Sequence, residues 1–496
     1  MPQLLSARPL GRRAAGRLGS ETSAAPPSPK AQRCLATLLF LATFGVLLLG
    51  VCSAGHAAGF AETGHGDRSR GVSRVLGLPK GSCGHCHLEG AGVKFPMGLW
   101  RENDNELCYA CHRQAQLRGP FPGQEVYESS RHRTDPRTVW PGPYPPSRRE
   151  PGAAGKCLNC HSPHGKKDRL GTIPSLLVAR EEAVCLACHD GDPAVADIAR
   201  EIRKPYAHPA RLSSGKHAAR EEANPDRFSY VGGNRHAECA DCHNAHAAYP
   251  DSGQPLPPRA SNRNARVSRV RVLNREAGAV PLYEFLAAND SGTPALEYEI
   301  CFKCHSSWTQ QPPGQDDMAR LFNTNNASYH PVEGQARGLT IRPESFVPGM
   351  NAASIIYCGD CHGSDDSRVR GPHGSQNANL LRRPYLAQAA PRAVARDELC
   401  FLCHRFETYA QPLSSGFDLQ ASRFNPPATA GGHAFHVGRQ GFPCYACHDS
   451  HGSPQFPALL RPGRTPGIRS YSQRRDGGTC QATCHATRSY GINYPR

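Results

Sequence analysis

Little of this chain is suited to an ordinary hydrophobic core. Hydrophobic residues make up only 38% of its 496 residues, whereas glycine and proline number 49 and 44. A chain of this composition cannot build a large aliphatic core. Proline-rich stretches such as residues 140–146 would be typical of disorder in an ordinary protein. If the chain folds, something other than aliphatic packing must hold it together.

The chain also lacks spare cysteines. It contains 22 cysteines, and 20 of them fall in ten short motifs that each end in histidine. The remaining two, Cys34 and Cys52, lie in an apolar segment near the N-terminus. Because the rest of the chain has no cysteine left over, a structural disulfide framework is disfavoured.

Nine of the ten motifs read Cys-x-x-Cys-His, the attachment signature of c-type haem. Two thiols at this spacing reach the two vinyl groups on one edge of a porphyrin, and the histidine meets the iron as proximal ligand. A single Cys-x-x-Cys would leave zinc, a redox dithiol or a disulfide open, but here histidine follows every one. The cysteine pairs are Cys83 and Cys86, Cys108 and Cys111, Cys157 and Cys160, Cys185 and Cys188, Cys239 and Cys242, Cys301 and Cys304, Cys358 and Cys361, Cys400 and Cys403, and Cys444 and Cys447. The proximal histidines are His87, His112, His161, His189, His243, His305, His362, His404 and His448.

The tenth motif is longer by one residue. It reads Cys-Gln-Ala-Thr-Cys-His, with Cys480, Cys484 and His485 as the candidate haem-binding residues. The extra residue widens the spacing of the two thioether bonds, so a disulfide or a single thioether remains an alternative here. With this motif included, the sequence predicts about ten covalently attached haem c groups.

Residues 1–58 have the pattern of an export signal. A basic region precedes an apolar run over residues 34–54, and small residues follow at 53–58, where cleavage is expected. The run is also nearly long enough to stay as an N-terminal membrane anchor, and a lipoprotein box ending at Cys52 is a weaker alternative. Cytochrome c matures outside the bacterial cytoplasmic membrane. We therefore expect the exported cell envelope, either the periplasm, a membrane-anchored position or the cell surface.

The net charge of +16 does not indicate a nucleic-acid partner. Residues 1–54 hold six basic residues and one acidic residue, so the exported part carries about +11. Two propionates on each of ten haems would add about −20. The basic excess is therefore interpreted as compensation for propionates, and nucleic-acid binding is not expected.

The motifs recur as a repeated pair. A copy of the form CxxCHxxHG is followed by a leucine-rich LLR stretch and then by a copy preceded by an acidic and an aliphatic residue. This repeat resembles the doubled-CXXCH family of multihaem cytochromes c, from about Cys83 onward. The resemblance implies bis-histidine haems in close pairs and a role in electron transfer. Unit one departs from the pattern, with Met97 where the second histidine is expected, and unit five departs at its longer motif. The repeat predicts five dihaem units over residues 59–125, 126–200, 201–315, 316–415 and 416–496.

Two classes of histidine are candidates for the distal iron ligands. The first follows its own motif, and its members are His164, His246, His451 and, after an insertion, His373. So short a segment as His161 to His164 cannot pass round one macrocycle, so His164, His246 and His451 should bind neighbouring haems. The second class lies upstream of each motif pair. Its members are His65, His132, His208, His330 and either His436 or His433.

Other side chains are weighed against these. Met97 would raise the potential of its haem as a distal ligand, or it fills a gap in the core. The histidines expected to be surplus are His85, His217 and His236.

The expected fold class is a multihaem cytochrome c, mostly coil with short α-helices wrapped around stacked covalent haems, with little or no β structure. Helical composition with acids in the first turn predicts short helices over residues 103–111, 180–188, 294–304 and 395–403. The apoprotein should be largely unfolded. The arginine-rich residues 259–275 are interpreted as a solvated insertion in unit three rather than a docking patch.

Two functions follow from these features. The first is an electron conduit, with no catalytic residues, whose partners are other cytochromes, quinol-linked membrane modules or an extracellular acceptor such as a mineral. The second is a multihaem reductase of nitrite, hydroxylamine or a sulfur oxyanion, which would need one five-coordinate haem. No Cys-x-x-Cys-Lys motif, used by some such enzymes, occurs here. The conduit is the favoured interpretation.

Overall fold

The computed structural model describes residues 59–89, 94–115, 120–141, 152–210, 223–226, 236–290, 292–337, 341–385, 392–411, 416–425 and 431–492. Residues Gly59–Arg496 group into one compact unit. The export segment 1–58, with its apolar run 34–54, and the surplus candidate His217 lie outside the described residues. Within the part of the chain that is described, no helix is long and apolar enough to cross a bilayer.

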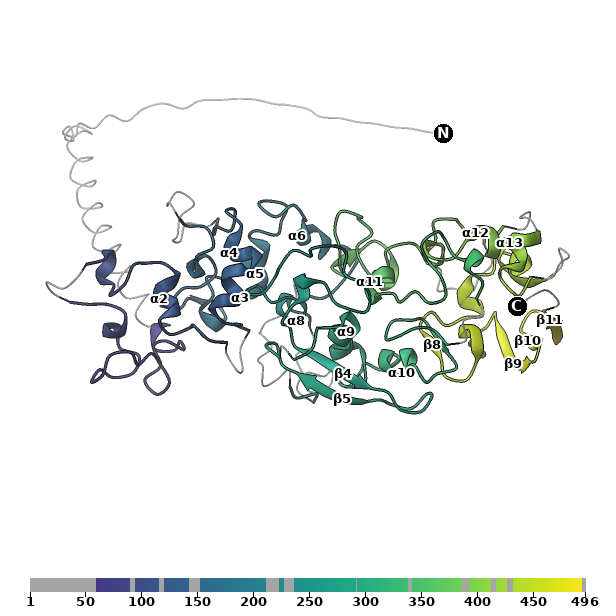
Figure 1. Ribbon diagram of the computed structural model, residues 1–496, viewed down its shortest axis with the longest axis horizontal. Helices are drawn as coiled ribbons and strands as arrows, with labels where there is room; N and C mark the ends of the chain where they lie inside the picture. Colours follow the sequence, from purple (N-terminus) through teal and green to yellow (C-terminus); the bar gives the residue numbers. More distant parts are fainter. Residues whose placement is uncertain are drawn as a thin grey trace, which may run out of the picture. The chain divides into compact units, whose positions relative to one another are not determined.

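Most of the described chain is coil, punctuated by short helices, as Figure 1 shows. The helices are α2 (Asn105–Tyr109), α3 (Gln124–Ser129), α4 (Arg131–Thr134), α5 (Glu181–Leu186), α6 (Ile198–Glu201), α8 (Cys239–Cys242), α9 (Glu297–His305), α10 (Met318–Phe322), α11 (Cys358–Cys361), α12 (Phe406–Tyr409) and α13 (Gly416–Gln420). The 3₁₀ turns are η1 (Cys83–His85), η2 (Pro96–Gly98), η3 (Cys157–Asn159), η4 (Pro174–Leu176), η5 (Asn262–Asn264), η6 (Pro343–Ser345), η7 (Ala378–Leu380), η8 (Leu399–Leu402), η10 (Cys444–Ala446) and η11 (Pro457–Leu459), and η9 (Ala434–Arg439) is a π-helix.

Helices lie in all four regions where the sequence predicts them. Three of these regions contain α2, α5 and α9, and residues 395–403 contain the 3₁₀ turn η8. Acidic side chains begin them: Asp104 caps α2 by accepting from the backbone N–H of Glu106, and Glu181 and Glu182 occupy the first turn of α5. Negative charge at this end offsets the helix dipole and satisfies free N–H groups.

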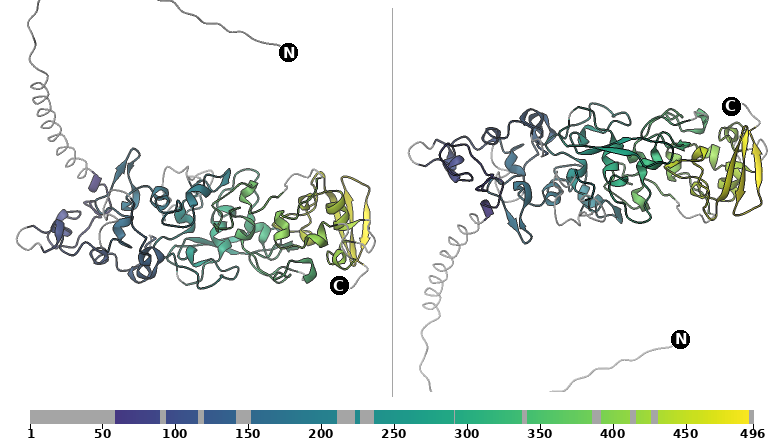
Figure 2. Two further views of the ribbon diagram at one scale, coloured as in Figure 1. Left: turned by 90° about the horizontal axis from the view of Figure 1, so that it is seen from above. Right: turned by 90° about the horizontal axis from the view of Figure 1, so that it is seen from below.

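The described strands form five small antiparallel sheets, which is more β structure than the sequence led us to expect. The strands are β1 (Lys167–Asp168), β2 (Gly171–Thr172), β3 (Tyr206–Ala207), β4 (Arg269–Leu273), β5 (Leu282–Leu286), β6 (Ser328–Tyr329), β7 (Gly374–Ser375), β8 (Gly452–Ser453), β9 (Ile468–Arg474), β10 (Gly477–Ala482) and β11 (Arg488–Gly491). The pairs are β1 with β2, β3 with β7, β4 with β5 and β6 with β8, and β10 lies between β9 and β11 (Figure 2). The mostly-coil expectation therefore holds, while the expectation of little or no β structure was too strict.

Strand β4 corrects the interpretation of residues 259–275 as a solvated insertion. Val267 and Val270 are buried, and the Arg269 side chain is also buried, with its Nε 3.1 Å from Oε2 of Glu299 in α9. Arg269 also donates to the carbonyl of Thr293. The alternation of valine and arginine is typical of a strand with one packed face. A run of arginines normally indicates a solvated segment, but here the charge of Arg269 is paired with Glu299 inside the protein.

Aliphatic packing in the described part is sparse, as the composition requires. One buried cluster joins Phe302, Ala319, Phe322 and Val332. A second joins Ala260, Val267 and Ile300. Both clusters lie around α9 and β4, and the remaining elements are short segments arranged around the cysteine motifs.

Candidate haem-binding centres

The Cys-x-x-Cys-His motifs form single helical turns. In eight of the nine, the histidine N–H donates to the carbonyl of the first cysteine at 2.9–3.0 Å, and the ninth lies within α9. In such a turn, residues three apart lie on the same face. The local fold therefore directs both thiols of a motif to one side and places its histidine immediately after them.

The tenth motif is built differently. Cys480 lies on strand β10, paired with Tyr471 of β9 and Arg488 of β11, and Cys484 and His485 follow the strand. The Cys484 thiol is exposed. The extra residue of this motif is thus accommodated on a strand rather than in a helical turn.

Each of the ten motif histidines faces a second histidine. The ring centroids lie 6.0–6.5 Å apart in every pair. We number the motifs 1 to 10 in chain order, so that odd motifs begin the five units and even motifs complete them. The odd-motif pairs are His87 with His164, His161 with His246, His243 with His373, His362 with His451, and His448 with His433. The even-motif pairs are His112 with His65, His189 with His132, His305 with His208, His404 with His330, and His485 with His436.

This spacing fits an iron between two imidazoles. A metal–nitrogen bond of ~2 Å on each side, with ~1 Å from each nitrogen to its ring centre, gives a centroid separation of about 6 Å. Among the described residues, no three His, Cys, Asp or Glu side chains gather as ligands for a bare metal ion. The arrangement of two opposed imidazoles, with two cysteines beside one of them, fits a haem iron.

Backbone carbonyls set the tautomer of one histidine in every pair. In the odd motifs it is the motif histidine, whose Nδ1 lies 2.7–3.1 Å from a carbonyl oxygen. These contacts are His87 to Met97, His161 to Ser175, His243 to Arg263, His362 to Asn379 and His448 to Ala458. Because a carbonyl only accepts, Nδ1 must carry the proton, which leaves the Nε2 lone pair for the iron.

The leucine-rich stretches supply these carbonyls. Ser175, Asn379 and Ala458 stand directly before the two leucines and have left-handed backbones, with φ of 56°, 58° and 52°. The second leucine of each stretch then forms a single β-bridge with the motif histidine: Leu177 with His161, Leu381 with His362 and Leu460 with His448. The stretch is thus a turn that aims one carbonyl at the imidazole.

Met97 occupies the same turn position in unit one. Its φ is 61°, its carbonyl accepts from His87, and its side chain is 66% exposed. His164 stands on the other side of His87. Met97 therefore corresponds to the LLR turn rather than to the second histidine of the repeat, and it lies neither in the distal position nor in the core.

In the even motifs it is the distal histidine whose Nδ1 bonds a backbone carbonyl, and this carbonyl has the same position in every unit. In all five units, Nδ1 of this histidine bonds the carbonyl of the residue immediately before the distal histidine of the neighbouring odd motif, at 2.6–3.2 Å. The contacts are His65 to Pro163, His132 to Ala245, His208 to Pro372, His330 to Ser450 and His436 to Gly432. The two distal ligands of each unit are therefore joined.

The odd-motif distal histidines come from the following unit. His164, His246, His373 and His451 each stand opposite the first motif histidine of the unit before their own. In unit five, His433, one residue before η9, takes this place. The sequence offered His433 only as an alternative to His436, whereas in the structure each of them stands opposite a different motif histidine. The signal was the presence of both histidines upstream of the motifs of this unit.

Close backbone packing holds these distal segments. A Cβ on Gly374, which follows His373, would lie 1.8 Å from the carbonyl oxygen of Glu201. A Cβ on Gly452, which follows His451, would lie 1.9 Å from the carbonyl oxygen of Leu321. The glycine after the histidine in the repeat is needed for this approach.

Two of the surplus histidines have structural roles. His85 is fully buried, its Nδ1 accepts from the N–H groups of Arg74 and Val75, and its Nε2 donates to the carbonyl of Pro79. His236 is buried beside Glu238, with Nε2 2.9 Å from Oε1.

Burial favours the neutral form of several of the paired imidazoles. Burial, followed by the repulsion of neighbouring histidines, lowers the pKa of His189 and His373 to about 4. The same causes lower the pKa of His404 and His433 to about 3. A neutral imidazole is the form that binds a metal, so these side chains are ligand-competent at neutral pH.

Consecutive motifs neighbour one another through their thiols. Between units, thiols of successive motifs lie close enough for one to shift the pKa of the other, and the pairs are Cys108 with Cys157, Cys185 with Cys239, Cys301 with Cys358, and Cys400 with Cys444. Within units, burial raises the pKa of one thiol, and a thiol of the adjoining motif raises it further. These pairs are Cys86 with Cys111, Cys160 with Cys188, Cys304 with Cys242, Cys361 with Cys403, and Cys447 with Cys480. All nine junctions connect successive motifs, so the ten sites are neighbours in chain order.

Comparison with known families supports the repeat. The family model described as the doubled CXXCH motif matches residues 150–194. These residues carry a doubled CXXCH motif. The resemblance expected from the sequence is confirmed for this segment, which spans motifs 3 and 4. The match indicates a multihaem c-type cytochrome with covalently bound haem c. No curated protein and no solved structure matches the chain.

Proposed function

We propose that this chain is a decahaem cytochrome c that conducts electrons through ten bis-histidine haems in the cell envelope. The observation that carries the proposal is the second histidine opposite every motif histidine, at 6.0–6.5 Å between ring centroids. With both axial positions filled, no coordination site is left for a substrate, which favours electron transfer over catalysis.

The chain's own residues would hold each haem in three ways. The cysteine pair attaches it, the two imidazoles fix its axial positions, and one carbonyl bond per pair locks an imidazole in the ligand tautomer. When bound, haem supplies a one-electron iron couple, whose potential is kept low by two histidine ligands. The cysteines of successive motifs lie beside one another, so each site neighbours the next and an electron has a continuous series of sites.

The reductase alternative has less support. It requires one motif histidine with an open position opposite, and the described residues contain ten opposed pairs. The location and the partners follow from the class of c-type cytochromes. Because c-type cytochromes are typically exported, a periplasmic, membrane-anchored or surface position is proposed. Other redox proteins or an extracellular acceptor are proposed as partners.

Two measurements on the exported holoprotein test this function. Intact mass should show ten haems per chain, and the variant C480A/C484A should lose one. The ferric protein should give only low-spin EPR signals, and the reduced protein should bind little carbon monoxide. A high-spin signal integrating to one haem, together with one bound carbon monoxide, would favour the reductase instead.

A further inference from the structure

The ten histidine pairs differ in the angle between their two imidazole planes. In the five odd-motif pairs the planes are near parallel, 7° to 24° apart. In the five even-motif pairs the planes are tilted further, from 35° in two pairs to 76° in the pair of His132 with His189, and we call these five pairs crossed. The two ranges do not overlap, and because the motifs neighbour one another in chain order, the two kinds alternate along the series.

The crossed planes have a structural cause in the carbonyl bond of the distal histidine. A hydrogen bond to Nδ1 lies in the plane of the ring, so its acceptor fixes the rotation of that ring. In the even motifs the acceptor belongs to the distal segment of the neighbouring odd motif. The ring is therefore oriented by a segment that holds another haem and not by its own motif. His132, whose Nδ1 lies 2.8 Å from the carbonyl of Ala245, shows the largest crossing, at 76° to His189.

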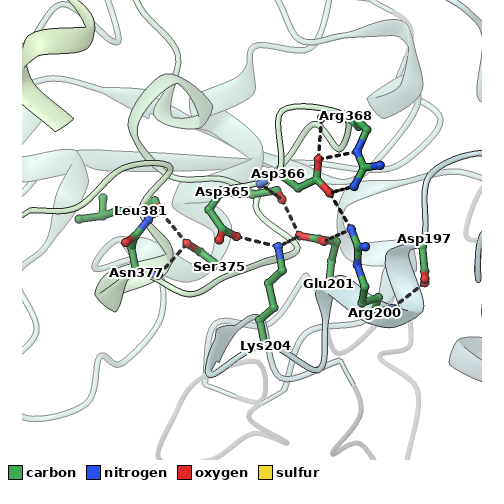
Figure 3. Close-up of polar contacts among 11 residues, drawn as sticks. Asp197, Arg200, Glu201, Lys204, Asp365, Asp366, Arg368, Ser375, Asn377 and Leu381 are labelled. Carbon is green, nitrogen blue, oxygen red and sulfur yellow. Dashed lines mark hydrogen bonds and ion pairs between the residues drawn. The ribbon is translucent and has the colours of Figure 1, made fainter. Parts of the chain in front are cut away.

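The acceptor segments are held against rotation. Arg131 N–H donates to the carbonyl of Ala248 beside the His132 bond. Strands β3 and β7 pair Ala207 with Gly374 beside His208 and His373. An ion-pair network reinforces this pair of strands: the fully buried Glu201 of α6 meets Lys204 at 2.6 Å, and Lys204 meets Asp365 at the same distance (Figure 3). In unit four, His330 N–H donates to the carbonyl of His451 at 2.9 Å. Rigid supports of this kind keep the ring angles distinct.

The angle between axial planes controls the electronic state of a low-spin iron. Two parallel imidazoles donate into the same iron dπ orbital and split it from its partner, whereas a larger angle spreads the donation over both orbitals and makes the splitting smaller. We propose that the ten haems fall into two electronic classes of five that alternate along the series, odd motifs in one and even motifs in the other. This inference rests on the proposed function, since it requires all ten sites to be bis-histidine and low-spin.

EPR of the ferric holoprotein tests the inference directly. Five near-parallel haems should give a rhombic low-spin signal, and the other five should have larger maximum g values that rise with the angle and are largest for motif 4, at 76°. Two matched variants assign them. H132M should remove one haem from the large-g signal, and H246M, which alters a distal residue at 12° to its partner, should remove one from the rhombic signal.

The possible outcomes distinguish failure of the two electronic classes from failure of the proposed electron conduit. Two signals of equal weight, each depleted by its own variant, would support the two classes. One low-spin class for all ten haems, or both variants depleting the same signal, would overturn the classes and leave the conduit intact. A high-spin population in the unaltered protein would overturn the six-coordinate conduit and the inference with it. The spectrum of the unaltered protein decides between these even if a variant fails to mature.

Discussion

The interior units and the last unit meet the same requirement by different means. In unit three, the joined distal ligands are His208 and His373, which lie 165 positions apart and are brought together by strands β3 and β7. In unit five they are His433 and His436, three positions apart at the start of the π-helix η9. Yet His436 bonds the carbonyl of Gly432, the residue before His433, just as His208 bonds that of Pro372 before His373.

This difference shows which feature of the repeat is essential. Both units keep the hydrogen bond from the distal imidazole to the carbonyl before the other distal histidine. The element that brings the two together changes from a sheet between distant segments to a local helix. In the interior units this hydrogen bond also ties each unit to its successor, because one ligand of the pair comes from there. In the last unit both histidines of this bonded pair belong to the unit itself. A unit built in this way therefore takes both of its distal histidines from itself.

The largest predicted effect compares motif 8 with motif 10. Cys400 lies beside Cys444, and the ring of His404 packs on Phe346 at 5.2 Å and on Tyr409 at 5.4 Å between ring centroids. By contrast, Cys484 is exposed. We expect C400A/C403A to abolish accumulation of holoprotein, because an interior haem supports its neighbours. We expect C480A/C484A to accumulate with nine haems.

Haem-stained yield of the exported protein and intact mass distinguish the two variants. Equal loss of yield in both would show that the last site supports the fold as much as an interior one. Survival of the motif 8 variant with nine haems would show that the interior units fold independently of one another, contrary to the ligand exchange between them.

The next effect concerns Gly374 of β7, which packs against the carbonyl of Glu201 at the end of α6. We call this contact the clamp. Gly374→Ala would place a Cβ 1.8 Å from the carbonyl oxygen of Glu201, so α6 and β7 must separate. We expect the free energy of unfolding to fall by about 2–3 kcal/mol. Thermal or denaturant unfolding followed at the Soret band measures it. Gly253→Ala is the control, since nothing lies within 4 Å of its Cβ. An unchanged stability in Gly374→Ala would mean that the clamp is not a close contact.

The ion-pair network beside this clamp should contribute a comparable or smaller amount. Glu201 is fully buried and accepts from Lys204, Arg200 and Ser364. Glu201→Gln leaves Lys204 without its buried partner, although Asp365 remains, and should cost about 2 kcal/mol. The exposed pair of Glu62 with Lys167 is the matched control, and Glu62→Gln should leave the unfolding midpoint unchanged. A midpoint in Glu201→Gln as high as in the unaltered protein would contradict a supporting role.

Predictions from the sequence agree with the structure where a site is built from neighbouring residues, and they differ where it depends on residues far apart in the chain. The attachment motifs are readable because Cys-x-x-Cys-His is complete within five residues. The spacing of His161 and His164 could exclude one haem for His164, but it could not name His87, because that partner depends on tertiary packing. The LLR turn was visible as a pattern, yet its purpose depends on a left-handed backbone at Ser175 that aims a carbonyl. The burial of Arg269 was missed because its partner Glu299 lies 30 positions away.

The last predicted effect is a pH dependence centred on Glu333 of interior unit four. Burial raises the pKa of Glu333 to about 8, against the opposing hydrogen bond from Asn274, whose Nδ2 lies 2.6 Å from Oε2. Because the folded protein then binds this proton more tightly than the unfolded chain, its contribution to stability is complete at low pH and is lost as the pH rises from about 5 to about 8. Thermal unfolding across this range should show a falling midpoint that Glu333→Gln flattens. The last unit, whose acidic Asp476 lies exposed in a turn, offers Asp476→Asn as the comparison, and this variant should keep the slope. A slope that persists in Glu333→Gln would assign the titration to another group.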